Sequence, residues 1–326
     1  MFEPGAELGE RAERRLYEVS RDRYAPVLAA FAAGWLDDLA REPGGVALCL
    51  GRDGLAPFVA AQALLRAAPR RFRGVSPRRV GLAYLSRPLA RRAVSDPHQG
   101  QLLTRHLRAR GVTEDRPLTL VDVGIHGSIQ DCLQRLFPAG AVRGHYLVLR
   151  RRHADPNGAA KRGFLADLDV APHSPLGLAP VWPPPPGWEV GGRLRAGEAC
   201  FLRPRAIHIL EDLWNGVGGS AVGLREAGGA GRVVAVRARN LPELALGAPP
   251  LPPRVLARLK RAALRGVADG VLRSCRGGAP PDDVPGAVGA FAAWLRELDE
   301  PAPLDAHLLD LLVRRRSGQR ADGEEG

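Results

Sequence analysis

The sequence predicts an α/β fold in which helices cover a parallel β-sheet, with N-terminal helices before the sheet and a mainly helical cap after it. Two observations support this prediction. Four short apolar segments between residues 44 and 152 suit buried strands, and segments of helical periodicity separate them. Glycine or polar residues follow directly after three of these strands, as expected where parallel strands end at a ligand cleft.

The same patterns divide the chain into five parts. These are an N-terminal helical segment (1–43), an α/β core (44–152), a Pro- and Gly-rich loop excursion (153–200), a mainly helical cap (201–316) and a flexible tail (317–326). No internal repeat is evident.

The composition excludes several classes of protein. A chain of 326 residues can form one large domain or two medium ones. It contains no apolar run near the ~20 residues that a membrane span needs, and no charged-then-apolar leader opens it, so we expect a cytoplasmic protein. The cysteines are scattered without CxxC spacing, which favours small buried side chains over a zinc site or a disulfide framework. They are Cys49, Cys132, Cys200 and Cys275.

The net charge of +12 raises the question of a nucleic-acid partner. Almost all basic residues are arginine, since the only lysines are Lys161 and Lys260, and the chain is rich in Ala, Gly and Pro. This composition is typical of high-GC codon usage. Aromatic residues make up only 5% and no nucleic-acid motif is present, so we expect no nucleic acid. An anionic small ligand, or at most a peripheral membrane contact, would use the same charge.

The first elements in the chain are helical. Residues 8–41 have an apolar helical face, and Pro26 marks either a break or a first turn between two helices. A strand at 46–50 then leads into Gly51-Arg52-Asp53-Gly54, and a helix is expected over 55–66. The Arg52–Asp53 pair suits either contact with an anion or a local salt bridge, and the sequence leaves both open.

The next two strands end in further candidate residues. The segment 80–85 ends in Ser86-Arg87, and a helix is expected over 98–110. The strand 118–122 closes with Asp122 and runs into a glycine-containing turn before a helix that begins near Ile129.

The residue order in that turn is typical of an anion-binding site. Gly124 and Gly127 allow close approach of the backbone, and Ser128 opens a helix whose N-terminal N–H groups and dipole favour a phosphate. An ordinary strand–glycine–helix joint would look the same, and that alternative stays open. A fourth strand is expected over 142–150. Six polar side chains would then share the carboxyl edge of the sheet: Arg52, Asp53, Ser86, Arg87, Asp122 and His126.

The C-terminal part is less regular. Beyond the loop-rich stretch 151–200, residues 203–214 predict a helix that contains Glu211 and ends in a glycine-rich turn with Ser220. Further helices are expected along 256–271, 291–298 and 304–313.

Two segments resemble a known family. GRDGLAPFVAAQALL (51–65) is similar to the pyrophosphate-loop segment of type I phosphoribosyltransferases, and LTLVDVGIHGSIQDCL (118–133) is similar to their phosphoribosyl pyrophosphate motif. The resemblance implies a phosphoribosyltransferase-like core. The chain departs from the family where an adjacent acidic pair is usual, because Val123 follows Asp122 here.

A longer set of segments resembles a group of bacterial surface-polysaccharide proteins that are often fused to glycosyltransferases or haloacid-dehalogenase-type phosphatases. The segments are RDG (52–54), YLSR (84–87), VDVGIHGSIQ (121–130) and ILEDLWNGVGGSAVGL (209–224). The resemblance implies transfer of 5-phosphoribosyl from phosphoribosyl pyrophosphate to a glycan. The chain has no Asp-x-Asp-x-Thr phosphatase motif, so a separate phosphatase or glycosyltransferase partner would act with it.

This chemistry assigns roles to the candidates. The loop from Arg52 to Gly54, with Arg52 or Arg87 as a fork-like contact, would bind pyrophosphate, and Gly124 to Ser128 would bind the 5-phosphate. Asp122 would take the ribose hydroxyls, while Asp53 and His126 compete as the base. Mg²⁺ would be held mainly by pyrophosphate and water, with no residue assigned as a metal ligand.

Glu211 and Ser220 are the acceptor-site candidates. Two other classes remain open. One is a regulator that binds phosphoribosyl pyrophosphate without turnover, and the other is a phosphatase-like hydrolase, against which the missing nucleophile motif weighs.

Overall fold

We describe the protein from a computed structural model. The described residues are 4–51, 53–137, 141–150, 155, 157–169, 179–180, 201, 204–214, 218–227, 232–239, 252–275 and 283–298. Arg52, the predicted helix 304–313 and the predicted tail lie outside them.

A six-stranded sheet forms the centre, in the order β2-β1-β3-β4-β5-β6. The first five strands are parallel and β6 runs antiparallel to β5. Every residue of β1 and β3 is buried, as expected for parallel strands covered on both faces. The predicted parallel α/β sheet is therefore confirmed. The strands are β1 (Val46–Gly51), β2 (Val80–Tyr84), β3 (Leu118–Asp122), β4 (Val142–Arg150), β5 (Lys161–Asp169) and β6 (Ala179–Pro180).

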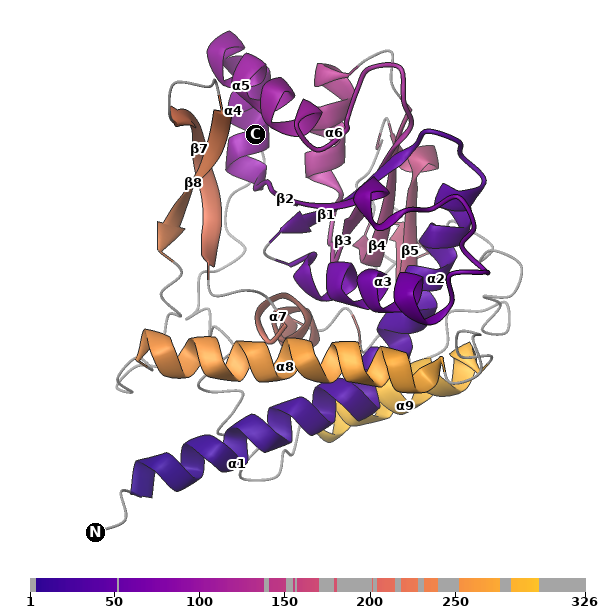
Figure 1. Cartoon of the computed structure of the whole chain (residues 1–326), viewed down its shortest axis with the longest axis vertical. Coiled ribbons are helices and arrows are strands. Elements are labelled where there is room, and N and C mark those ends of the chain that lie inside the picture. The colour runs from indigo at the N-terminus through magenta and orange to yellow at the C-terminus, as the bar shows by residue number, and fades with distance from the viewer. Residues whose placement is uncertain are drawn as a thin grey trace.

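Helices cover both faces of the sheet (Figure 1). Alternate residues of β1 point to opposite sides, so that Ala47 and Cys49 join one apolar core while Leu48 and Leu50 join the other. The first core contains residues of α2, α3 and the C-terminal helices, and the second contains residues of α4, α5 and α6. These connecting helices are α3 (Leu55–Ala67), α4 (Arg87–Ser95), α5 (Pro97–Arg108) and α6 (Ser128–Leu136).

The N-terminal and C-terminal helices form a layer on the first core. α1 (Pro4–Val19) lies along α8 (Pro253–Ser274), as Figure 1 shows at the bottom of the view. The approach is close, since a Cβ on Gly266 of α8 would overlap the Tyr17 carbonyl oxygen. Before α2 (Ala25–Ala40) the chain stays helical, because a π-helical turn, Ser20–Tyr24, joins α2 to α1. Pro26 lies in the first turn of α2, which confirms one of its two expected roles.

An aromatic cluster joins this layer to the rest of the C-terminal region, which also contains α7 (Pro204–Asp212) and α9 (Val284–Glu297). The Tyr24 ring stacks on Trp214 with centroids 3.8 Å apart and on Phe291 at 5.2 Å. Among the described residues, no helix combines the length and the apolar composition that crossing a bilayer requires.

Two elements correct the sequence predictions. β5 lies inside the stretch 153–200, which was expected to be loop. The connection 151–160 is shorter than the usual crossover between parallel strands, and β5 begins with a lysine, so neither signal indicated a strand. α4 was also missed, although Ser86 caps it and Pro88 stands in its first turn.

The C-terminal region is mainly helical, as predicted, with α7, α8 and α9. It also contains an antiparallel hairpin of β7 (Gly218–Ala227) and β8 (Arg232–Arg239). The hairpin packs against α4 and α5, on the opposite face of the sheet from α7 and α8. The region 201–316 therefore contributes to both faces of the sheet.

Candidate functional site

The strand order places a topological switch point between β1 and β3. The chain leaves β1 toward β2 on one side and leaves β3 toward β4 on the other, which is where open α/β sheets bind ligands. Cys49 pairs with Val121, so these two strands end side by side. The loops after Gly51 and after Asp122 therefore follow neighbouring strands at the same edge of the sheet, as the sequence predicted.

Asp122 is buried at the end of β3, where its Oδ1 accepts the N–H of Val123 at 2.9 Å. Its charge acts on two buried neighbours. Burial raises the pKa of Cys49 and of Tyr146, and the charge of Asp122 raises both further. Asp122 thus shapes its own turn as well as carrying charge at the switch point.

The loop after β3 is fixed to β4. The Val148 N–H donates to the Val123 carbonyl at 2.9 Å, and the Arg150 N–H donates to the Ile125 carbonyl at 2.8 Å. Between these bonds Gly124 has φ 138°, and a Cβ there would overlap the Val148 carbonyl oxygen. Gly124 is required by this close approach, and the loop is held in place without a ligand.

Gly127 precedes the first turn of α6. It is left-handed, with φ 64°, and caps α6 without a side-chain hydrogen bond. A Cβ at this position would lie 2.9 Å from Tyr146 Oη and 3.0 Å from Lys161 Cε. The N–H groups of Ser128 and the next two residues have no acceptor within the helix, so their dipoles favour an anion beyond Gly127.

His126 is half-buried in the same loop and is oriented by backbone. Its Nδ1 lies 2.8 Å from the Arg150 carbonyl oxygen. A carbonyl oxygen only accepts, so Nδ1 carries the hydrogen and the neutral ring keeps Nε2 as its basic nitrogen. This tautomer suits a general base.

On the β1 side, Gly54 closes a tight turn. Its N–H donates to the Leu50 carbonyl at 2.7 Å, and a Cβ would lie 2.6 Å from Leu50 N. Asp53 is half-buried, and its charge adds to burial in raising the pKa of Tyr24 in the aromatic cluster. Arg52 lies outside the described residues, so the choice between anion contact and local salt bridge stays a prediction.

Ser86 and Arg87 differ in what they contact. The Ser86 hydroxyl accepts the Leu89 N–H at 3.2 Å and donates to the Ala221 carbonyl, so it caps α4 and ties the hairpin to it. Arg87 is exposed at the first residue of α4, and within the described chain no ion pair holds it. Arg87 is thus the better placed of the two for an anion.

The acceptor candidates lie on different elements. Glu211 is half-buried on α7, whose apolar residues belong to the first core. Ser220 belongs to β7, and its side chain lies outside the described residues. The acceptor role of both residues therefore stays a prediction.

A buried ionic cluster behind Gly127 was not predicted. Lys161 is fully buried and its Nζ lies 2.7 Å from both Asp131 Oδ1 and Asp155 Oδ2, while Asn157 Nδ2 donates to Asp131 at 2.8 Å. One signal could have indicated it. Both lysines of this arginine-rich chain, Lys161 and Lys260, are buried.

A neutral network adjoins this cluster. Tyr146 Oη donates to Gln130 Oε1 at 2.9 Å, and Gln130 Nε2 donates to the Val142 and Ala160 carbonyls at 3.0 and 3.1 Å. Burial, followed by the charges of Asp122, Asp131 and Asp155, raises the pKa of Tyr146 well above its usual range. The phenol of Tyr146 therefore stays protonated and donates its hydrogen bond to Gln130 of α6.

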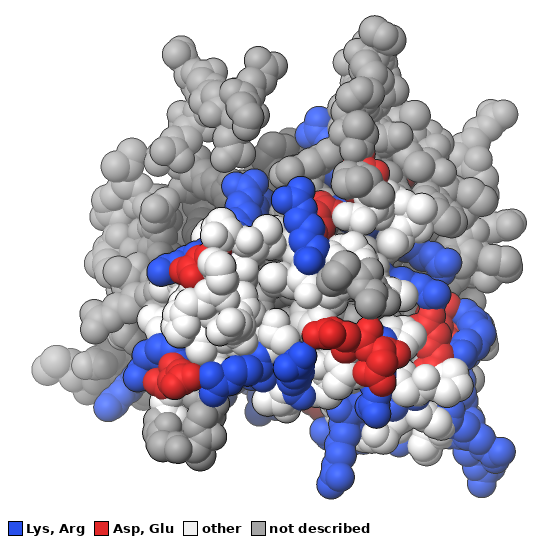
Figure 2. All heavy atoms as spheres, turned by 90° about the horizontal axis from the view of Figure 1, so that it is seen from above, with Lys and Arg blue, Asp and Glu red and all other residues white. Residues whose placement is uncertain are grey.

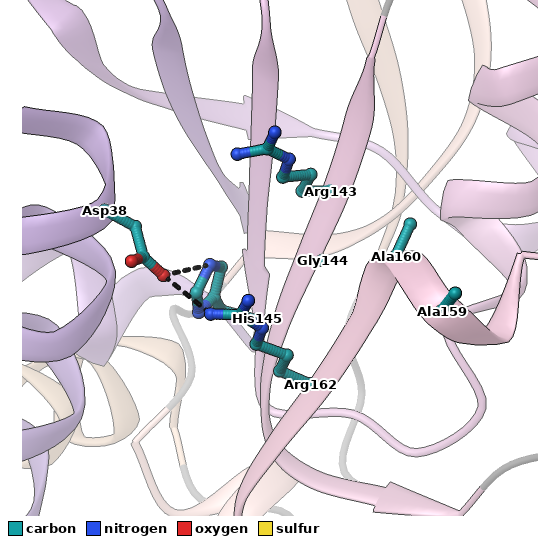
Figure 3. A pocket seen from close by; sticks show the side chains of 7 residues that line it. All are labelled: Asp38, Arg143, Gly144, His145, Ala159, Ala160 and Arg162. Carbon is teal, nitrogen blue, oxygen red and sulfur yellow. Dashed lines mark hydrogen bonds and ion pairs between the residues drawn. The ribbon is translucent and has the colours of Figure 1, made fainter. Parts of the chain in front are cut away.

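A pocket lies at the opposite edge of the sheet. A cavity of about 270 Å³ opens at the amino ends of β4 and β5, beside the last turn of α2 (Figure 3). In the described part of the chain, no group of three or more His, Cys, Asp or Glu side chains is placed to hold a metal. A Mg²⁺ ion held mainly by substrate and water would need no such group.

The charge of the surface is mixed. On the described part of the face in Figure 2, Lys and Arg side chains are interspersed with Asp and Glu and form no continuous basic stripe. No protein-family model matches this sequence, and no curated protein matches it either. The fold and the site geometry therefore carry the functional argument.

Proposed function

We propose that the protein transfers a 5-phosphoribosyl group from phosphoribosyl pyrophosphate to a hydroxyl acceptor, a glycan of surface-polysaccharide synthesis. The observation that carries the proposal is the end of β3. Asp122, a backbone-fixed glycine loop and the α6 N-terminus without a side-chain cap follow one another at the switch point of a parallel sheet.

The reaction displaces pyrophosphate from C1 of ribose through an oxocarbenium-like state, so the protein acts mainly by holding charges in place. The α6 N-terminus and Ser128 would bind the 5-phosphate, and Asp122 would face the ribose hydroxyls. Arg87, together with Arg52, would contact pyrophosphate and its Mg²⁺. His126 has the tautomer to take the acceptor proton at Nε2.

Two partners follow from this proposal. The product would keep its 5-phosphate, so a separate phosphatase would act after the transfer, and a glycosyltransferase partner would supply or extend the acceptor. A phosphorylated donor of this kind also places the protein in the cytoplasm.

One observation favours a second candidate, a sensor that binds the donor without turnover. Asp122 Oδ1 already accepts the N–H of its own turn, and Val123 stands where the family carries a second carboxylate. With a single carboxylate, binding of the phosphate groups would persist while stabilisation of the ribose cation weakens.

Binding and turnover are tested together. Phosphoribosyl pyrophosphate with Mg²⁺ at 100 times its dissociation constant should stabilise the fold by about 2.7 kcal/mol, read as a rise in melting temperature. Pyrophosphate release with a pool of glycan acceptors measures turnover. Asp122→Asn should keep donor binding but reduce transfer by roughly a hundredfold or more, because the lost charge acts mainly in the transition state.

The matched control is Asp115→Asn, which makes the same change at an exposed carboxylate before β3 and should leave both readouts unchanged. Equal turnover by the wild type and Asp122→Asn would remove Asp122 from the mechanism. Donor binding without turnover on any acceptor would favour the sensor.

A further inference from the structure

The cavity at the amino edge of the sheet is lined by side chains from several elements. Arg143 and His145 line it from β4, Arg162 from the start of β5 and Asp38 from α2, as Figure 3 shows. The amino ends of parallel strands lie at the edge opposite the loops after β1 and β3. The cavity is therefore separate from the proposed transfer site.

His145 forms the buried side of the cavity. Its ring is 5% exposed, and Nε2 lies 3.5 Å from Asp38 Oδ2. Burial lowers the pKa of His145 to about 4, the charge of Asp38 opposes this, and Arg162 and Arg143 lower it further. The ring is thus neutral at pH 7 and offers a polar but uncharged wall.

The two arginines form the mouth. Their side chains are about half exposed, at 54% for Arg143 and 46% for Arg162. Arg162 Nη1 lies 3.1 Å from Asp38 Oδ2, and Arg143 pairs with Glu42 outside the cavity. A guanidinium has five N–H donors, so an arginine paired with a carboxylate can still bind a second acceptor.

The charges do not cancel within the cavity. Its lining residues carry two positive charges, on Arg143 and Arg162, and one negative charge, on Asp38, which gives a net charge of +1. The outer partners Arg41 and Glu42 balance each other. A net positive, half-open site with two guanidinium groups favours an oxyanion.

The size limits the ligand. A cavity of about 270 Å³ is below the range of roughly 300–1,000 Å³ typical of sites for drug-sized ligands. The wall opposite His145 is made of small residues, Ala159 and Ala160, which leave the space open. We propose that this cavity binds a small oxyanion, a phosphate or carboxylate group, between Arg143 and Arg162.

Inorganic phosphate is the probe, titrated calorimetrically at constant ionic strength, with acetate in a parallel series to separate phosphate from carboxylate. Arg162→Gln should weaken binding of the preferred anion about tenfold or more, as expected for loss of a charge-assisted hydrogen bond. Arg41→Gln is the matched control. It removes the same charge and also a partner of Asp38, but Arg41 does not line the cavity, so affinity should change less than about twofold.

Ala160→Leu fills part of the cavity without changing its charge and should abolish binding of the anion. Melting temperatures confirm that each variant is folded. Equal weakening by Arg162→Gln and Arg41→Gln would mean a general effect of net charge and would overturn the site. Binding that survives both Arg162→Gln and Ala160→Leu would belong elsewhere, such as the α6 N-terminus, which rejects the cavity while leaving the proposed function intact. No binding of either anion to the wild type also rejects it.

Discussion

The two edges of the sheet use different chemistry. At the carboxyl edge the main groups are backbone: glycines, the first N–H groups of α6 and a loop whose carbonyls are bonded to β4. At the amino edge they are side chains, with Arg143, His145, Arg162 and Asp38 drawn from three elements. A backbone site depends on contiguous sequence, whereas a side-chain site depends on packing. The difference explains why only the carboxyl edge was predicted.

The largest expected effect tests the buried ionic cluster behind Gly127. Lys161→Met should lower the free energy of unfolding by about 3–5 kcal/mol, because Asp131 and Asp155 would be left without the buried cation they share. Urea denaturation measures the loss. Arg108→Met is the control, since Arg108 forms an exposed pair with Glu114 and should cost at most about 1 kcal/mol. A loss for Lys161→Met no larger than that of the control would show that the cluster does not support the loop.

Gly124→Ala tests the loop itself. The new Cβ would overlap the Val148 carbonyl and would also occupy a positive φ, so we expect a loss of about 3 kcal/mol or more in urea denaturation. Gly44→Ala separates the two causes. Gly44 also has positive φ, at 80°, but nothing lies within 4 Å of its Cβ position, and about 1 kcal/mol is expected. Similar losses in both variants would mean that β4 does not clamp the loop.

The sequence predicted much of the fold and the candidate site at the carboxyl edge of the sheet, but not the cavity at the amino edge. The strands 46–50 and 118–122 were recognisable because parallel strands buried on both faces are largely apolar runs. The strand 142–150 was recognisable from its apolar second half, Tyr146 to Leu149. β5 was not, since it starts with a polar lysine whose charge is satisfied only by Asp131 and Asp155 after folding. Gly124 and Gly127 were predicted as substrate contacts. Each is also required by close packing against residues of β4 or β5, which the sequence alone does not reveal.

Arg143, Arg162 and Asp38 gave no signal, because their spacing has no local period. They meet only after β4 pairs with β5 and Asp38 of α2 forms an ion pair with Arg162. Ser86 shows the opposite case. A hydroxyl after a strand suggested ligand contact, yet the same residue type is favoured at helix N-termini, and that is where its hydrogen bonds go.

The smallest expected effect compares a histidine at each edge. The pKa of His145 is about 4 in the folded protein, below the ~6.5 of an unfolded chain. Above pH 6.5 both states hold a neutral ring, so the contribution to stability is fully present. As the pH falls from 6.5 to 4, the unfolded state binds a proton that the folded state excludes, and stability decreases. The full difference corresponds to at most about 3 kcal/mol, and pairing of the protonated ring with Asp38 would reduce it.

His145→Asn should therefore flatten the profile of unfolding free energy between pH 4 and 6.5. The comparison variant is His126→Asn, which removes a half-buried ring at the carboxyl edge, and the flattening should be greater for the buried His145. The buried His106, whose pKa is also lowered by burial, remains in both variants, so the difference between the two profiles isolates His145. Equal slopes in the two variants would show that the amino-edge histidine carries no linked proton.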